Sequence, residues 1–314
     1  MKPRFDPRLY QITALTALLI YGISALHFDV TVARSTLILG VAIGAQALCS
    51  RIWGVRFDPR SAAISGLSLC LLLRSNSVVL VLIAAVIAVG SKFVIRWRGK
   101  HIFNPTNVAI VALMLFTPRV WVSPGQWGNL AFFAFLIACL GGLVVNRAAR
   151  SDVTYAFIAA WCALLIGRSL WLGEPMTIPL HRLENGALLL FTFFMISDPR
   201  TTPDSRAGRM LFAAMVALGG AYIQFKLFRT NGILWSLAAC SLLVPFIDAL
   251  LPAERYSWNS HGGSPWSVAY SRLLSLSSAP LLRTPSAAST SPKETQRFSI
   301  GPHRSSSSAT QIGP

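Results

Sequence analysis

Apolar runs of roughly 15–22 residues recur along this chain between residue 9 and residue 251. A helix rises about 1.5 Å per residue, so runs of this length match the roughly 30 Å hydrocarbon core of a bilayer. Charged residues make up only 12% of the 314 residues and hydrophobic residues 54%, whereas soluble domains average about 25% charged residues. A membrane β-barrel would require alternating polarity, which is absent. We therefore expect an all-α integral membrane protein.

The runs predict about ten transmembrane helices, two of which are unusually short. The third and the eighth each offer 13 residues, the third between Arg60 and Arg74 and the eighth between Glu184 and Asp198. Apolar stretches of about 10–14 residues are typical of broken or re-entrant elements. The ten predicted spans lie at about 9–28, 33–53, 61–74, 77–97, 103–117, 128–147, 151–173, 182–198, 207–228 and 231–251.

The two halves of the membrane domain, about 9–117 and 128–251, resemble each other. Gly66–Arg74 (GLSLCLLLR) and Gly186–Phe191 (GALLLF) occupy corresponding positions, and each half continues through a long span to an Asn-containing turn. Because five spans per half is an odd number, the second copy must be inverted. Inverted repeats hold a substrate or cofactor near their interface. Chance similarity between Leu-rich helices is the alternative.

The distribution of basic residues predicts the orientation. The net charge is +17, and the basic residues lie between the apolar spans. The N-terminus and the even-numbered connections carry 15 Lys and Arg residues, while the odd-numbered connections carry seven. The positive-inside rule then places both termini in the cytoplasm of a bacterial-type inner membrane. No segment combines a basic face with interleaved aromatic residues, so we expect lipid contact and no nucleic-acid binding.

The absence of several known motifs argues against several classes of chemistry. The five cysteines are isolated within apolar spans, and no Cys-x-x-Cys or Cys/His cluster is present, so we expect no iron–sulfur, c-type haem or zinc site. No nucleophile triad or phosphate loop appears, and we assign no catalytic residue. The membrane domain is expected to end at residue 254, and the Ser/Pro-rich residues 255–314 to form a disordered cytoplasmic tail.

Two polar turns carry the candidate site residues. Asn104 and Pro105 begin the fifth span, where Asn is suited to cap free backbone N–H groups and Pro to the first helical turn. Together with Lys100 and Thr106 they offer donors and positive charge to an anion. The alternative is an ordinary capped helix start flanked by positive-inside lysines.

The second turn ends the eighth span at Asp198-Pro199, and Thr201 follows. Pro cannot continue a helix without losing a hydrogen bond, and an acid at the bilayer boundary is suited to bind a cation or pair with Arg200. A solvated helix stop is the alternative. Because the connections place both turns on the cytoplasmic side, we expect a vestibule open to the cytoplasm.

Three segments in order resemble a known family: GKHIFNPTN (99–107), FFMISDPRTTP (193–203) and LVPFID (243–248). Over roughly residues 35–252, the chain resembles a membrane subunit that two complexes share. It is the D subunit of the Rnf electron-transport complex and the B subunit of the sodium-translocating NADH:quinone reductase. The resemblance implies ten helices in an inverted repeat, flavin binding, and assembly with other membrane and redox subunits into a pump for Na⁺ or H⁺.

The chain departs from this family at the site of covalent flavin attachment. Family members carry FMN on the Thr of a Ser-Gly-Ala-Thr-type motif between the fifth and sixth spans. Here that loop, Thr117–Trp127, lacks the motif, and the similar spacing Ser151–Thr154 lies in the next connection. We therefore expect no covalent flavin. Leu73-Arg74-Ser75 also replaces an LPP-like end of the third span, as in a divergent or stand-alone relative.

The function that these observations favour is that of a membrane subunit in a redox-driven ion-transport complex. It would be at most one part of an oxidoreductase, with FMN or riboflavin bound non-covalently at Lys100, Asn104, Thr106, Asp198 and Thr201. The alternatives are a non-redox transporter or channel on the same scaffold, and a structural membrane anchor.

Overall fold

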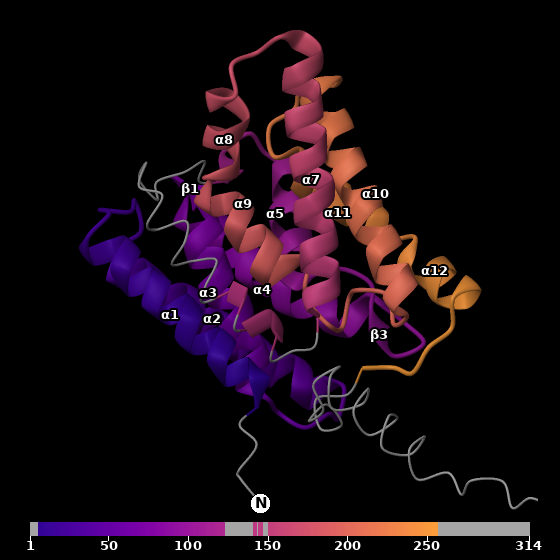
Figure 1. Ribbon diagram of the computed structural model, residues 1–314. Coiled ribbons are helices and arrows are strands. Elements are labelled where there is room, and N and C mark those ends of the chain that lie inside the picture. The colour runs from indigo at the N-terminus through magenta and orange to yellow at the C-terminus, as the bar shows by residue number, and fades with distance from the viewer. Residues whose placement is uncertain (1–5, 123–140, 143, 147–149, 257–314) are drawn as a thin grey trace, which may run out of the picture. The chain divides into compact units, whose positions relative to one another are not determined.

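The computed structural model describes residues 6–122, 141–142, 144–146 and 150–256. These residues all belong to one compact unit, and helices dominate it (Figure 1). Most of the predicted sixth span, including Cys139, and the tail from residue 257 onward lie outside the described residues.

Five helices make up the first half of the chain, and most of them begin at a polar cap. Asp6, Thr31, Asp58 and Asn104 each accept a hydrogen bond from a backbone N–H of the following turn, which satisfies groups that have no partner within the helix. The helices are α1 (Pro7–Ser24), α2 (Val32–Ile52), α3 (Pro59–Leu72), α4 (Val78–Val94) and α5 (Pro105–Phe116).

In the described part of the second half, shorter helices lie between and after two longer ones, α7 and α10. Its described elements are α7 (Ser151–Leu172), α8 (Thr177–Leu183), α9 (Gly186–Leu190), the π-helix η1 (Phe191–Met195), α10 (Arg206–Phe225), α11 (Gly232–Ser241) and α12 (Val244–Leu250).

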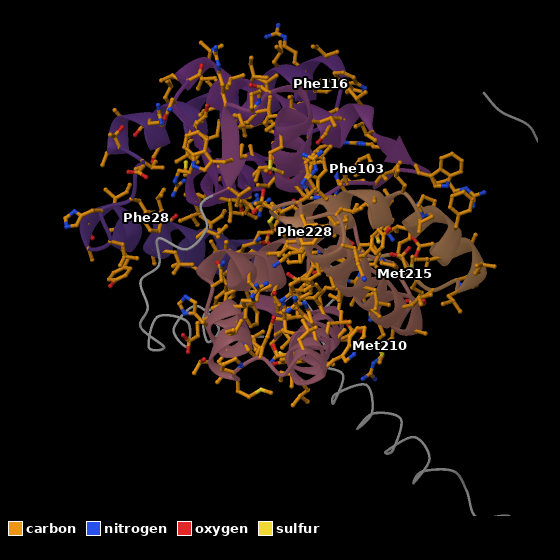
Figure 2. The ribbon with its side chains drawn as sticks, turned by 90° about the horizontal axis from the view of Figure 1, so that it is seen from above. Phe28, Phe103, Phe116, Met210, Met215 and Phe228 are labelled. Carbon is orange, nitrogen blue, oxygen red and sulfur yellow. The ribbon has the colours of Figure 1, made fainter. Side chains whose placement is uncertain are left out.

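Three described helices, α2, α7 and α10, are long and apolar enough to cross a membrane, and α11 and α12 together make a fourth candidate that is bent by 52°. Large apolar side chains also point outward, among them Phe116 and Phe228, which are 82% and 85% exposed (Figure 2). Apolar surface on this scale is typical of proteins that contact lipid. The chain is therefore a multi-pass membrane protein.

The short elements expected at the third and eighth spans are present. α3 contains 14 residues and gives way to extended backbone at Leu73. The eighth span begins as α9 and changes into the π-helix η1 before the chain turns at Asp198. π-helices occur mostly as single turns inside α-helices, and these turns are frequent at functional sites.

Four short strands show that the expectation of a purely helical chain was too simple. β1 (Leu73–Ser75) pairs antiparallel with β4 (Val120–Val122), and β2 (Arg96–Trp97) pairs with β3 (Lys100–His101). The second pair is a hairpin whose two turn residues, Arg98 and Gly99, have φ values of 49° and 82°. Left-handed backbone at both positions is typical of two-residue hairpin turns and is readily adopted by Gly.

The helices pack in two series that meet at α5 and α11. α2 packs against α3 and α4, and α4 packs against α5; α7 packs against α10, and α10 against α11. Across the junction the Asn107 side-chain amide donates to the carbonyl oxygen of Leu234 at 3.2 Å. Within the second series, the rings of Phe157 and Phe191 lie 5.2 Å apart in the core. This packing brings the predicted turn before α5 close to the turn after η1.

Candidate functional site

A cavity of about 890 Å³ opens where α4 ends and α3 and α5 begin. Its lining comes from the N-terminal ends of α1 and α3, the C-terminal end of α4, the start of α5 and the turn after η1. Pockets of roughly 300–1,000 Å³ accommodate cofactors and other small ligands. The cavity therefore has the size of a binding site and includes both turns predicted from the sequence.

Asn104 joins the two turns. Its Oδ1 accepts the N–H of Asn107 at 3.0 Å, which caps α5, and its Nδ2 donates to the Met195 carbonyl oxygen at 3.3 Å. Nδ2 also lies 3.4 Å from Oδ2 of Asp198. Thr106, in the first turn of α5, is buried and lines the cavity. The structure thus brings Asn104, Thr106 and Asp198 together.

Asp198 organises the second turn through both its side chain and its backbone. Its Oδ1 accepts the Arg200 N–H at 3.0 Å, and its carbonyl oxygen accepts the N–H groups of Thr201 and Thr202, each at 3.2 Å. The Thr201 hydroxyl donates to the same carbonyl at 3.3 Å, and Thr201 is buried away from the cavity lining. Thr201 therefore shapes the turn rather than facing the cavity.

Lys100 lies apart from this group. Its Nζ is 3.0 Å from Oδ1 of Asp204 and 2.6 Å from Oδ2 of Asp248, beside a separate pocket of about 200 Å³. Asp248 also accepts the Asp204 N–H at 2.7 Å. The sequence suggested a cation available to an anionic ligand, but two carboxylates already neutralise the Lys100 ammonium group.

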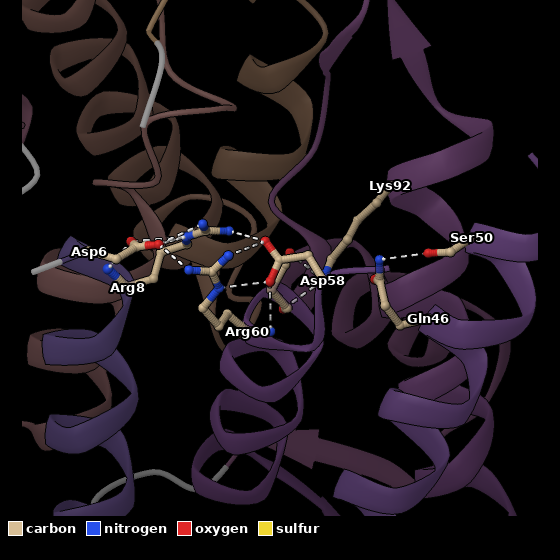
Figure 3. Close-up of polar contacts among 8 residues, drawn as sticks. Asp6, Arg8, Gln46, Ser50, Asp58, Arg60 and Lys92 are labelled. Carbon is tan, nitrogen blue, oxygen red and sulfur yellow. Dashed lines mark hydrogen bonds and ion pairs between the residues drawn. The ribbon is translucent and has the colours of Figure 1, made fainter. Parts of the chain in front are cut away.

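Several polar side chains inside the cavity were not predicted from the sequence. Lys92, within α4, donates from Nζ to the carbonyl and hydroxyl oxygens of Ser61 at 2.8 and 3.0 Å. Gln46 in α2 donates to Ser50 at 3.4 Å (Figure 3). Its Oε1 is buried without a hydrogen-bond partner in the described part of the chain. An orphaned acceptor that lines a cavity is available to a ligand.

His101 contributes a neutral imidazole to the cavity wall. Burial lowers the pKa of His101 to about 3, and the nearby cations Arg200, Arg96 and Lys92 act in the same direction. Its buried Nδ1 has no hydrogen-bond partner among the described residues. A neutral imidazole offers one donor and one acceptor.

The triplet Asp-Pro-Arg occurs three times around the cavity, at residues 6–8, 58–60 and 198–200. In each copy the Asp Oδ1 accepts the N–H of the Arg two residues later, at 3.0, 3.2 and 3.0 Å. Pro supplies the first helical turn after the Asp cap in the first two copies. A search for repeated three-residue motifs would have found this signal, whereas an analysis of hydrophobic periodicity does not detect it.

The first two triplets bind each other. Arg8 pairs with its own Asp6 at 2.6 Å and with Asp58, while Arg60 pairs with Asp58 at 2.9 Å and with Asp6 at 2.7 Å (Figure 3). Burial acts to raise the pKa of Asp58, but hydrogen bonds from Arg60 and Arg8 prevail and lower it to about 2. This reciprocal cluster joins the N-terminal end of α1 to that of α3 at the edge of the cavity.

The cavity lining is strongly basic. It contains Arg8, Arg56, Arg60, Lys92, Arg96 and Arg200 against the carboxylates of Asp58 and Asp198. Such an excess of positive charge favours an anionic ligand or an anionic portion of one.

The structure also shows the surroundings of Thr117 and Thr154, the threonines considered for covalent flavin attachment, and of side chains that could bind a metal. No group of three or more His, Cys, Asp or Glu side chains suited to a metal occurs among residues 6–122 and 150–256. Thr154 is fully buried in α7, where its hydroxyl donates to the Thr192 carbonyl oxygen at 3.3 Å. The Thr117 hydroxyl accepts the Arg119 N–H at 3.2 Å, and residues 123–127 of this loop lie outside the described residues.

Comparisons with known proteins confirm the resemblance found in the sequence. Residues 120–257 match the NQR2, RnfD, RnfE family. A stretch of 129 residues is similar to the D subunit of the ion-translocating oxidoreductase complex in several bacterial strains. It is 32% identical to that of Escherichia coli O9:H4 (strain HS) and of Escherichia coli (strain K12), and 33% identical to that of Escherichia coli O1:K1 / APEC.

Each match covers 39% of this chain and 34% of the relative. The chain thus spans about a third of the length of the curated relatives it matches. Within that stretch it is similar to D subunits of ion-translocating oxidoreductase complexes.

Proposed function

We propose that the chain is a membrane subunit of a redox-driven ion-transport complex and that its basic cavity binds a flavin non-covalently. The observation that carries this proposal is the convergence of the Asn104 and Asp198 turns on one ligand-sized cavity. The second of these turns lies within the stretch similar to subunits of ion-translocating oxidoreductase complexes. The complex supplies the electron donor, the acceptor and the other membrane subunits, and the coupled ion is Na⁺ or H⁺.

The residues that line the cavity fit FMN or riboflavin. An isoalloxazine ring needs both donors and acceptors at its edge, and Asn104, Gln46 and His101 provide amide and imidazole groups. Arg200 and Arg96 supply positive charge for a phosphate or for an anionic reduced flavin. When bound, a flavin supplies one- and two-electron transfer. Lys100 and Thr201 contribute indirectly, because they hold the hairpin and the turn that form the walls.

The proposed architecture is a ten-helix inverted repeat. Packing of α2, α4 and α5 in series, and of α7, α10 and α11 in series, supports this assignment. Asn107, near the start of α5, contacts Leu234, and Met114, near the end of α5, contacts Asn231 just before α11. The two helices are therefore antiparallel, which agrees with an inverted repeat. In this arrangement the cavity lies near the repeat interface and opens to the cytoplasm.

A non-redox transporter on the same scaffold is the second candidate. The cavity is lined by six cationic side chains, which would also suit an anionic solute. Flavin content distinguishes the two candidates, and a structural anchor would bind neither ligand.

Flavin binding to the purified full chain tests the proposal. We expect FMN or riboflavin to bind and the flavin fluorescence to be quenched. Asn104→Ala should weaken binding by about 10-fold, because the hydrogen bonds of the Asn104 side chain are lost. Asn185→Ala is the matched control, because Asn185 caps α9 in the same way but does not line the cavity. All bound flavin should be released on denaturation, since no covalent link is expected. Absence of binding to a well-folded parent protein would favour the transporter.

A further inference from the structure

A basic and aromatic patch lies where α2 and α4 end on the outside of the protein. α2 finishes with Arg51 and Ile52 and is followed by Trp53, Val55, Arg56 and Phe57; α4 finishes with Val94 and is followed by Arg96 and Trp97. Every one of these residues is exposed, and Trp53 and Trp97 are 48% and 54% exposed. We refer to these nine residues as the interfacial patch.

Ring contacts hold the two helix ends together. The Trp53 and Phe93 rings lie 5.7 Å apart, and the Arg96 guanidinium lies 5.3 Å from the centroid of the Phe93 ring. Arg56 and Arg96 also line the same cavity. The ends of α2 and α4 are therefore in contact with each other, and Arg56 and Arg96 lie beside one shared cavity.

The position of the patch follows from the length of α2. This helix has 21 residues and is a candidate membrane span, so it extends about 32 Å and crosses the hydrocarbon core once. Its last residues must then lie at the boundary between hydrocarbon and headgroups. Trp side chains concentrate at this depth, and Arg side chains extend from it toward the headgroups.

The arginines of the patch carry charge that no carboxylate among the described residues neutralises. In the part of the chain that the structure describes, Arg51, Arg56 and Arg96 make no ion pair with a carboxylate. Arg8 and Arg60, which line the same cavity, are occupied by Asp6 and Asp58. The two groups of arginines therefore differ, and only the first is available to an outside anion.

The surface beside the patch is apolar. Leu37, Ile43 and Leu48 are exposed along α2, and Val86 is 50% exposed on α4. α2 continues to the interfacial patch without a charged residue between Arg34 and Arg51. An apolar surface that ends in three unneutralised cations and two Trp rings complements a molecule with acyl chains and an anionic headgroup.

We propose that the interfacial patch binds an anionic phospholipid, with its phosphate at Arg51, Arg56 and Arg96 and its acyl chains along α2 and α4. The lipid would lie beside the cavity, since Arg56 and Arg96 belong to both surfaces. A soluble phosphate would meet the same cations but would leave the apolar surface uncovered.

Native mass spectrometry of the delipidated full chain tests this assignment with phosphatidylglycerol as the probe. We expect the variant R51Q/R56Q/R96Q to bind phosphatidylglycerol about 100-fold more weakly, because each basic residue near an anionic lipid contributes about fivefold. The control R119Q/K226Q/R229Q removes three exposed basic residues elsewhere and should change binding by less than about twofold. The variant R51K/R56K/R96K keeps the charges and should stay within about threefold of the parent.

Four results would overturn the proposal. One is equal binding of phosphatidylglycerol by the parent and by R51Q/R56Q/R96Q, provided that both elute as folded protein. Another is equal affinity of the parent for phosphatidylcholine. The third is displacement of the lipid by millimolar inorganic phosphate, and the fourth is loss of a co-purifying protein, rather than lipid, from the R51Q/R56Q/R96Q variant.

Discussion

Asp58 shares its carboxylate between the guanidinium groups of Arg8 and Arg60 and caps α3 at the same time. Ion pairs between exposed groups contribute little to stability, but networks of partly buried, bidentate pairs contribute more. The Arg8 and Asp6 side chains are 11% and 18% exposed. The cluster therefore helps to hold α1 against α3.

The stability of the protein should depend on the ionisation of Asp58 at low pH. Its pKa is lowered from 3.8 to about 2 in the folded protein. The stabilisation is therefore complete above about pH 4 and is lost as the pH falls through about 2. We expect the unfolding temperature in detergent to decrease more steeply over this range for the parent than for Asp58→Asn. Asn caps a helix about as well as Asp, so this variant isolates the charge. Identical pH profiles would contradict the prediction.

At the scale of single residues, the sequence predicted positions better than roles. Asn104, Thr106 and Asp198 do meet at one cavity, because caps and Pro turns are local features that a sequence encodes directly. Lys100 does not join them, since its partners Asp204 and Asp248 are supplied by tertiary packing. Lys92 and Gln46 were missed because a single polar residue in an apolar run does not reveal which neighbour it faces.

The β2–β3 hairpin and α12 are joined by one lysine between two carboxylates. Lys100 lies on β3, Asp248 on α12 and Asp204 in the loop before α10. Their side chains are only 8–19% exposed, so the charges are largely removed from water. The hairpin also carries His101 into the cavity wall. The stability of this contact therefore affects the shape of the cavity.

Removing the charge of Lys100 should lower the free energy of unfolding more than removing the charge of an exposed lysine. Lys100→Met leaves two neighbouring buried carboxylates without a cation, and breaking a buried ion pair costs about 3–5 kcal/mol. We expect a loss of about 3 kcal/mol in the free energy of unfolding, measured by denaturant titration in detergent. Lys226 is exposed and makes no ion pair with the described residues, so Lys226→Met should change this free energy by less than about 0.5 kcal/mol.

A second substitution distinguishes charge from packing in this cluster. Asp248→Asn in the Lys100→Met background removes one of the two repelling carboxylates and should recover part of the lost stability. If the double variant is less stable than Lys100→Met alone, the cluster stabilises the fold through packing rather than charge.

At the scale of elements, the breaks were predictable and the strands were not. Short apolar stretches between charged residues predicted that the third and eighth spans would be truncated, as α3 and the α9–η1 segment are. Pairing of β1 with β4 joins residues 73–75 to residues 120–122. Such long-range pairing depends on which surfaces meet in space, and runs of two or three residues carry too little periodicity to predict it.

At the scale of the whole molecule, hydrophobicity predicted the class of protein but only part of its architecture. α2, α7 and α10 correspond closely to predicted spans. Others are divided into shorter pieces, such as α11 and α12, because π-turns, Pro and Gly interrupt helices that hydropathy treats as continuous. The inverted repeat that we propose would be a relation between the two halves, which hydropathy within one span cannot predict, and the packing of α5 against α11 is consistent with it.

The orientation of the molecule in the membrane is the last prediction and decides which side every site faces. Basic residues are about twice as frequent in the N-terminus and even-numbered connections as in the odd-numbered ones, and such segments are retained in the cytoplasm. A reporter active only outside the cytoplasm should be active when fused after Gly125 and silent after Ala253. A reporter active only inside should give the reciprocal pattern at the same two positions. The opposite result would place the cavity, the Asp-Pro-Arg cluster and the interfacial patch on the external side, where the electron-donating partners that we propose in the cytoplasm could not reach them.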